Sequence, residues 1–239
     1  MKFSAFLSQH LPSQKKLLLV KKKQRPVIPD PLRHAGSRSG GSFRPVDQKA
    51  PYPEAVCFHT TGEFSRRPDG AGTYKAHCCP TAITNLLLTY NRAGLAPKVG
   101  LHSPGSLFID IAEWGRRRLL YWNMFLLNYF GGVSVPLTGL YLRAMLRRYD
   151  FHPRRVLPHL LFPRRALIRS MESGHLGIVS VLAHPTYHSH TMMLCGLTTL
   201  ENEQGDRLHY IRLADGWGHE PRYLCVEDLG LFLFWDIRV

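Results

Sequence analysis

The apolar residues of this sequence change their spacing at Gly174. Before Gly174 they recur every three or four positions over several segments, which is the spacing of one face of an α-helix. After Gly174 they stand in short runs rich in β-branched residues, separated by polar turns. Helices first and strands afterwards are typical of an α+β domain, here a helical N-terminal part packed on a C-terminal antiparallel β-sheet.

Four segments before this change are predicted to be helical. In the first, Ile83, Leu86 and Leu87 share one face, and Gly94 follows its end. The last begins with Pro163, which is tolerated in a first turn because no hydrogen bond needs its missing N–H. The predicted helices span residues 80–91, 106–130, 137–148 and 163–173.

One stretch, 119–142, contains no charged residue. A membrane-spanning helix needs about 20 mostly apolar residues, so its length is sufficient. However, Asn123, Asn128 and the pair Gly131-Gly132 interrupt it. We therefore interpret it as a buried helix, a Gly-Gly break and the start of another helix, and we expect no transmembrane segment.

Five short strands are predicted after Gly174. The segment 191–197 is apolar on both faces, which indicates a central strand. The polar stretch 201–206 is predicted to be a hairpin loop that lets the next strand pair back. The predicted strands span residues 177–183, 191–197, 208–214, 222–226 and 231–239.

The positive charge of the chain is concentrated near its N-terminus. The sequence has 31 Lys and Arg against 17 Asp and Glu, and residues 1–50 hold eleven of these cations but only two acids. Prolines and a Gly/Ser stretch follow the lysines. We predict a basic, Pro/Gly/Ser-rich flexible tail over residues 1–55 and a folded domain over 56–239. Residues 1–50 are compatible with an anionic partner, nucleic acid or a membrane surface, but a solvated leader is favoured.

The cysteine count bears on the compartment. The chain has five cysteines, an odd number. Its first residues lack the apolar run of about 7–15 residues that a secretory signal needs. We therefore expect reduced thiols and a cytoplasmic location, with at least one thiol available for chemistry. The cysteines are Cys57, Cys78, Cys79, Cys195 and Cys225.

Cys78 is the most informative of these residues, because Pro80 places it at the start of a predicted helix. The unpaired N–H groups and the dipole of a helix N-terminus stabilise a thiolate, which is the reactive form of cysteine. Cys78 is thus a candidate nucleophile. The alternative is a small apolar side chain that is simply buried.

Two further residues match the needs of a nucleophilic cysteine, namely a base and a group that orients it. His190 precedes the apolar strand 191–197, so its imidazole is expected at a sheet edge facing a cleft. Asp215 ends the next predicted strand, within reach of His190, and Trp217 could shield their hydrogen bond from water. Taken singly, these residues also fit a polar loop and an Asp-Gly turn.

Together the three segments resemble the papain-like cysteine peptidases, and among them the C39-like group. In that group a Cys-Gly-Pro-Thr/Ala-Ala-like motif opens a helix, a histidine heads a strand, and an Asp or Asn heads a turn with Trp. The resemblance covers residues 70–225 in order and spacing. The matching segments are residues 78–82, 190–196 and 215–218, and residues 171–180 look like the strand before the histidine.

This resemblance implies a papain-like fold and acyl transfer without a cofactor. The Cys78 thiolate would attack an amide or thioester carbonyl of a peptide or amide substrate. His190 would protonate the leaving group, and Asp215 would fix the His190 tautomer. Water or another acceptor would then resolve the acyl-enzyme.

The sequence departs from the family pattern at two points. The glycine expected after the nucleophile is Cys79, although the register with Pro80 favours Cys78 as the functional thiol. The upstream glutamine that donates to the oxyanion is missing, since no glutamine lies between Gln48 and Cys78. The backbone N–H of Cys78, with Tyr74 or His77, could replace it. Losing one such donor costs about 3–4 kcal/mol of transition-state stabilisation.

Two other functions remain open. One is a non-catalytic papain-fold binding module whose basic tail contacts nucleic acid or an anionic membrane. The other is a zinc site, because thiolates and imidazoles are zinc ligands, but the sequence has no CxxC pair and no HExxH motif, adjacent cysteines point their thiols differently, and we predict no metal. The zinc candidates are His77, Cys78, Cys79, His184, His188 and His190.

Overall fold

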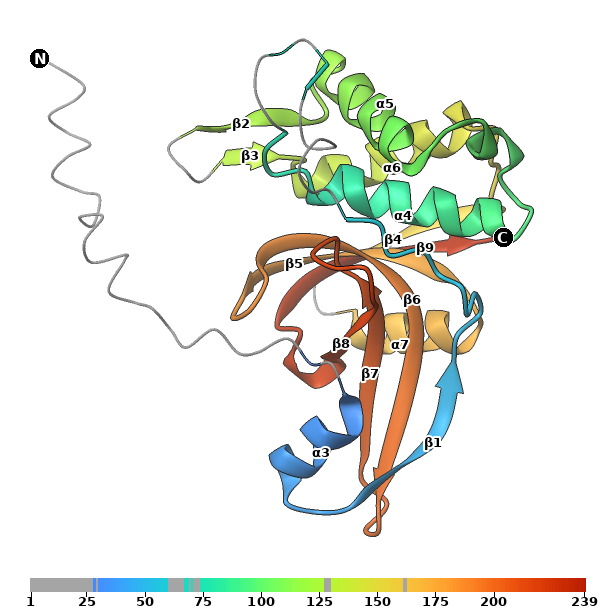
Figure 1. Ribbon diagram of the computed structural model, residues 1–239. Coiled ribbons are helices and arrows are strands. Elements are labelled where there is room, and N and C mark those ends of the chain that lie inside the picture. Colours follow the sequence, from blue (N-terminus) through green and yellow to red (C-terminus); the bar gives the residue numbers. More distant parts are fainter. Residues whose placement is uncertain are drawn as a thin grey trace, which may run out of the picture.

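The helix predicted from residue 80 forms as α4 (Cys78–Arg92), and its residues 79–90 are all buried. The structure is a computed structural model, and it describes residues 28, 30–59, 67–68, 70, 74–126, 130–160 and 163–239. On one side α4 contacts α5 (Pro104–Arg117), and on the other it lies against the sheet (Figure 1). The helix that carries Cys78 therefore lies between α5 and the sheet.

The upper layer in Figure 1 is helical, as the sequence predicts. It contains α4, α5, α6 (Val135–Arg148) and the short 3-10 helix η2 (Pro97–Leu101). Ser103 caps α5 by accepting a hydrogen bond from the Ser106 N–H. Prolines open α5 and α6 at their first turns, where their missing N–H is not needed.

The predicted helix over 106–130 is wrong in its second half. Helix α5 ends at Arg117 because Leu119 adopts a left-handed conformation (φ 59°), and the amides of Leu120 and Tyr121 both bond to the Gly115 carbonyl. The chain then forms a hairpin of β2 (Trp122–Leu126) and β3 (Phe130–Gly132). Residues 127–129 lie outside the described residues.

The lower layer is an antiparallel sheet, so the α+β class is confirmed. All five predicted strands are present, and the described residues add β1 and β4 to them. The order is β4-β9-β5-β6-β7-β8, with β1 also paired to β6. The strands are β1 (Phe43–Lys49), β4 (Arg155–His159), β5 (Leu176–His184), β6 (His188–Asn202), β7 (Arg207–Ala214), β8 (Arg222–Cys225) and β9 (Leu231–Arg238).

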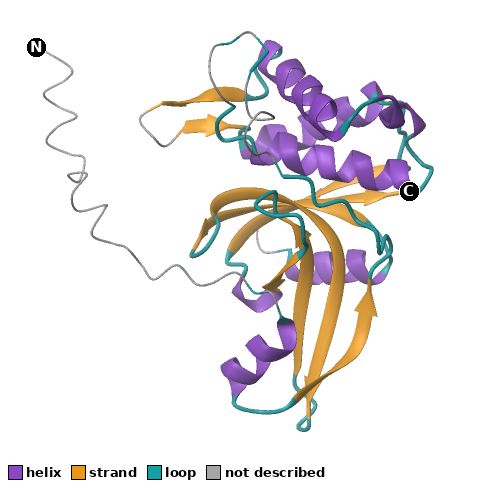
Figure 2. Ribbon diagram, in the orientation of Figure 1, coloured by secondary structure: helices purple, strands orange, loops and turns teal. Residues whose placement is uncertain are grey.

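The sheet is covered on both faces, as Figure 2 shows. One face packs on the helical layer through residues such as Ile178 and Met193. The other packs Val179 and Met192 against α7 (Arg164–Glu172) and against the curled far strands. Neighbours in sequence thus point to opposite faces, which is why β5 and β6 are almost continuously apolar.

The fold begins earlier than the predicted boundary between residues 55 and 56. Residues 31–39 form α3 (Pro31–Ser39), capped by Asp30, and β1 pairs antiparallel with the second half of β6. This pairing depends on hydrogen bonds between backbone N–H and C=O groups and does not require a regular spacing of apolar residues. The composition of the segment therefore did not indicate it. The predicted tail over 1–55 therefore differs from the structure from Asp30 onward; the lysine-rich residues 1–27 lie outside the described residues.

No helix in the described part of the chain combines the length and the apolarity that crossing a bilayer requires.

Candidate active site

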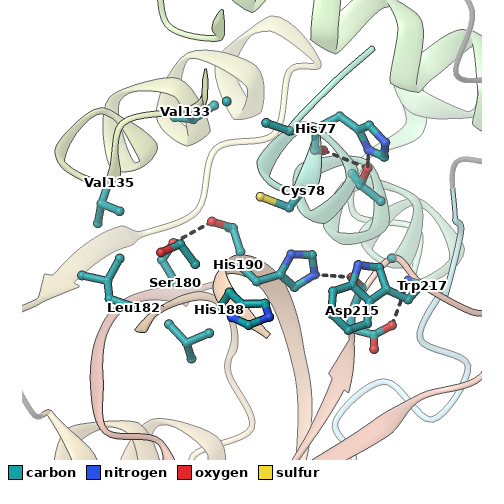
Figure 3. Close-up of a pocket in the computed structure, with 17 residues that line it drawn as sticks. His77, Cys78, Val133, Val135, Ser180, Leu182, His188, His190, Asp215 and Trp217 are labelled. Atoms are coloured by element: carbon teal, nitrogen blue, oxygen red, sulfur yellow. Dashed lines mark hydrogen bonds between the residues drawn. The ribbon is translucent and has the colours of Figure 1, made fainter. Parts of the chain in front are cut away.

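A groove of about 620 Å³ opens at the N-terminus of α4, between the helical layer and the sheet. Cys78 enters it from α4, and His190 and Asp215 enter it from β6 and from the end of β7. Figure 3 shows these three residues on facing sides of the groove. The structure thus brings Cys78 together with two residues that lie more than a hundred positions farther along the chain.

Cys78 is the thiol that faces this groove. It is the first residue of α4 and half-buried, whereas Cys79 is turned into the core and is 1% exposed. Burial, together with the neighbouring Cys78 charge, raises the pKa of Cys79 far above its ordinary value. Of the two adjacent cysteines, Cys78 therefore lines the groove and Cys79 belongs to the core.

The turn before Cys78 is locally fixed. His77 is the N-cap residue of α4, and its carbonyl accepts a hydrogen bond from the Thr81 hydroxyl at 2.9 Å. The Nδ1 atom of His77 lies 3.1 Å from the Thr81 hydroxyl oxygen. Ala76 adopts φ 48°, an uncommon conformation for a residue with a side chain. Gly132 of β3 lies so close that a Cβ there would be 2.6 Å from the Ala76 carbonyl oxygen. Only glycine fits at 132, so the hairpin can approach the turn that presents Cys78.

His190 is oriented by main chain and by aromatic rings. Its Nε2 donates to the backbone carbonyl of Asp215 at 2.7 Å, since a carbonyl oxygen can only accept. Its ring stacks on Tyr187, with centroids 5.5 Å apart and an interplanar angle of 7°, and Trp217 covers it at 4.8 Å. Nδ1 is then the ring nitrogen left for Cys78.

The protonation of Cys78 and His190 is coupled. Burial would raise the pKa of Cys78, but hydrogen bonding and charge attraction from His190, followed by hydrogen bonds from Thr191, bring this pKa below its ordinary value. Burial would lower the pKa of His190, but Cys78 and the Asp215 carbonyl bring it above its ordinary value. Both shifts favour a thiolate–imidazolium pair, the reactive form of a cysteine nucleophile.

Asp215 occupies the expected place but uses a different group. Its carboxylate points away from the imidazole, as Figure 3 shows, and accepts from the Trp217 N–H at 2.9 Å. The other carboxylate oxygen accepts from the Tyr187 hydroxyl at 3.0 Å and from Arg222 Nη1 at 2.9 Å. The carbonyl of Asp215 orients His190, while its side chain, fully buried, anchors the turn.

Tyr187 and Arg222 are site residues that the sequence analysis missed. Tyr187 lies in the turn before β6, and Arg222 is the first residue of β8. One signal could have found Arg222: a buried aspartate needs a cation or several donors, and Arg222 is the closest arginine after Asp215 in the sequence. The stacking of Tyr187 has no sequence signal, because it depends on the fold of the turn.

The two side chains considered as oxyanion donors are placed differently. Tyr74 is buried and its hydroxyl donates to Glu113 at 2.8 Å, outside the groove. His77 lines the groove beside Cys78. The backbone N–H of Cys78 is one of the first N–H groups of α4, which have no partner within the helix.

The remaining zinc candidates do not assemble into a ligand set. His184 Nδ1 accepts from the N–H groups of Thr186 and Tyr187, so it closes the turn before β6. His188 is exposed and has φ 55°. Among the described residues, no group of three or more His, Cys, Asp or Glu side chains is arranged to hold a metal ion.

Comparison with known proteins does not assign the site. No family model, no curated protein and no solved structure matches this chain.

Proposed function

We propose that this chain is a cysteine-dependent acyl-transfer enzyme of the peptidase or amidohydrolase type, with a papain-like domain of the C39 type. The observation that carries the proposal is the pairing of Cys78 with His190 at a helix N-terminus inside a groove, with the two pKa values shifted toward the ion pair. A thiolate with an imidazolium beside it can attack a carbonyl and protonate the leaving group.

The reaction follows from these positions. The Cys78 sulfur attacks a carbonyl carbon, and the electrons of the C=O bond move to the oxygen, toward the N–H groups at the start of α4. His190 then gives its proton to the leaving amine or thiolate as that bond breaks, which leaves a thioester on Cys78. Water or another acceptor then attacks the thioester carbon while neutral His190 takes its proton, and the C–S bond breaks to release the acyl product and restore the Cys78 thiolate.

Asp215 has an indirect role in this proposal. Its carbonyl accepts the Nε2 proton of His190 and so fixes the tautomer, which is the task of the third residue in such sites. Its carboxylate, bonded to Arg222 and Tyr187, holds the turn that presents the carbonyl. We therefore regard the Asp215 side chain as a positioning group.

The groove wall supports an uncharged substrate. Among its described lining residues there is no Lys, Arg or Glu, and the one carboxylate, Asp215, is buried and paired. Val133, Val135 and Leu182 form an apolar side, to the left of Cys78 in Figure 3. A neutral peptide, amide or thioester fits this wall, because an unpaired charge would lose its hydration there without compensation.

Covalent labelling tests the proposal. Intact-mass measurement with substoichiometric iodoacetamide is expected to place the first label on Cys78, and p-nitrophenyl acetate is expected to leave one acetyl group there. Cys78→Ala should lose both adducts, while Cys195→Ala serves as the matched control and keeps them. Slow and uniform labelling of all thiols would contradict the enzyme proposal and leave the papain-fold binding module as the function. That module would bind DNA or anionic vesicles in a salt-sensitive way, and deletion of residues 1–27 should remove the binding.

A further inference from the structure

Two hydroxyl groups line the groove that Cys78 faces. Ser180 of β5 and Thr191 of β6 are paired across the sheet, and their side-chain oxygens are 2.8 Å apart. Thr191 also lines the groove with Cys78, and its main-chain N–H and hydroxyl help to lower the pKa of the Cys78 thiol. In Figure 3, Ser180 lies toward Val135 and Leu182, whereas Asp215 and Trp217 lie on the other side of His190.

These hydroxyls interrupt an apolar stripe. Ile178 precedes Ser180 by two positions on β5, and Met193 follows Thr191 by two on β6, so all four share the face toward α4. Ser180 is 1% exposed and Thr191 is 7% exposed, yet both line the groove. Burying a hydroxyl is unfavourable unless it is hydrogen-bonded, and a valine would fill such a position without that penalty.

The direction of the hydrogen bonds follows from the number of protons. A threonine hydroxyl carries one hydrogen and can donate only once. If Thr191 donates to the sulfur, its oxygen accepts from Ser180, which gives a chain from Ser180 through Thr191 to Cys78. Each donor in such a chain polarises the next, so the charge on sulfur is stabilised more than by a lone hydroxyl.

We propose that Thr191, supported by Ser180, is a positioning residue that holds Cys78 as a thiolate and fixes the direction of its sulfur independently of His190. This inference rests on the proposed function only in taking Cys78 as the nucleophile. His190 then need not supply all of the thiolate stabilisation, and its proton is freer to move to the leaving group.

The pH profile of Cys78 alkylation tests this role, because a purely structural residue would not move it. Donors to a thiolate lower the thiol pKa, so their removal raises it. Thr191→Val keeps the side-chain shape and is expected to shift the midpoint of the iodoacetamide rate profile upward, with alkylation about tenfold slower at pH 6. Ser180→Ala should shift it in the same direction by less.

The controls separate this effect from damage to the fold. Thr191→Ser restores the hydroxyl and should return the profile to that of the wild type. Thr198→Val changes a buried threonine farther along β6 and should leave the profile unchanged. An unshifted profile in both Thr191→Val and Ser180→Ala overturns the inference, as does an equal shift in Thr198→Val.

The outcome is distinguishable from failure of the proposed function. If Thr191→Val shifts the alkylation profile but the wild type forms no acetyl adduct, the hydroxyl chain stands and acyl transfer fails. If the wild type acylates and only His190→Ala changes the profile, acyl transfer stands and the hydroxyl chain fails.

Discussion

Cys78 and Cys225 are two thiols of this molecule in environments of opposite charge. Cys78 lies beside His190 in the groove, and its pKa is lowered. Cys225 ends β8 near the docked helix α3, where its thiol donates to the Glu227 carboxylate at 3.0 Å. Burial, followed by Glu227, raises the pKa of Cys225 to about 12. Both sites desolvate a thiol, so the sign of the neighbouring group decides whether a thiolate forms.

The cationic neighbours differ in a similar way. Arg38 of α3 reaches the Cys225 sulfur at 3.7 Å but forms an ion pair with Asp228, so its charge is shared. At the groove, Arg222 is held away from the sulfur by Asp215, and the imidazolium of His190 acts on Cys78. The comparison indicates that the groove is built to favour a charged sulfur, whereas the region around Cys225 is built to keep a neutral one.

The largest expected effect is the difference in reactivity of the two thiols. At pH 7 Cys78 should react with iodoacetamide about 10²–10³ times faster than Cys225, because only the thiolate attacks and the lower nucleophilicity of a low-pKa thiolate offsets part of the gain. Peptide mapping after timed labelling measures both rates in one sample. Comparable alkylation rates for Cys78 and Cys225 would contradict the claim that their neighbouring groups set the ionisation of the two thiols differently.

Removing the base should erase most of that difference. Without the His190 imidazolium the pKa of Cys78 rises, so in His190→Ala its alkylation should slow by about 10²-fold at pH 6 and approach the wild-type rate at high pH, where the thiol ionises unaided. A stopped-flow pH profile checks this, with His188→Ala, an exposed groove histidine, as the control. A profile of His190→Ala that matches the wild type would contradict the ion pair.

The ion pairs of the two regions should differ in their effect on stability. In Arg222→Met the fully buried Asp215 carboxylate loses its cation, and we expect a loss of about 3 kcal/mol in the free energy of unfolding. The Arg38–Asp228 pair is more exposed, at 35% and 24%, so Arg38→Met should cost about 1 kcal/mol or less. Urea unfolding measures both, and a loss of about 1 kcal/mol or less in Arg222→Met would show that the Asp215 carboxylate does not depend on Arg222.

The smallest expected effect is a partial activation of Cys225. Glu227→Gln removes the carboxylate that disfavours the Cys225 thiolate, so the pKa of Cys225 should fall. Its alkylation should accelerate by several-fold, which corresponds to about 1 kcal/mol in the free energy of thiol ionisation. Burial, the larger cause, remains, so Cys225 should stay slower than Cys78. The same peptide mapping tests this, and an unchanged Cys225 rate would assign its inertness to burial alone.

Local sequence determined the elements that carry the site. The spacing around Leu86 and the proline at 80 predicted α4 and placed Cys78 at its start, and the apolar run 191–197 predicted the strand behind His190. These predictions succeeded because helix and strand periods depend on residues a few positions apart. The family resemblance predicted that Cys78, His190 and Asp215 lie close together, and the structure gave the geometry of their contacts.

Tertiary contacts decided the rest. The end of α5 at Leu119, the pairing of β1 with β6 and the choice of carbonyl over carboxylate at Asp215 all depend on partners distant in sequence. The Asp215 carboxylate accepts hydrogen bonds from Arg222 and Tyr187, and His190 bonds to the main-chain carbonyl of Asp215 instead. The sequence by itself determined which residues could lie together at the groove. Only the packing of the two layers determined which atom of each residue makes the contact.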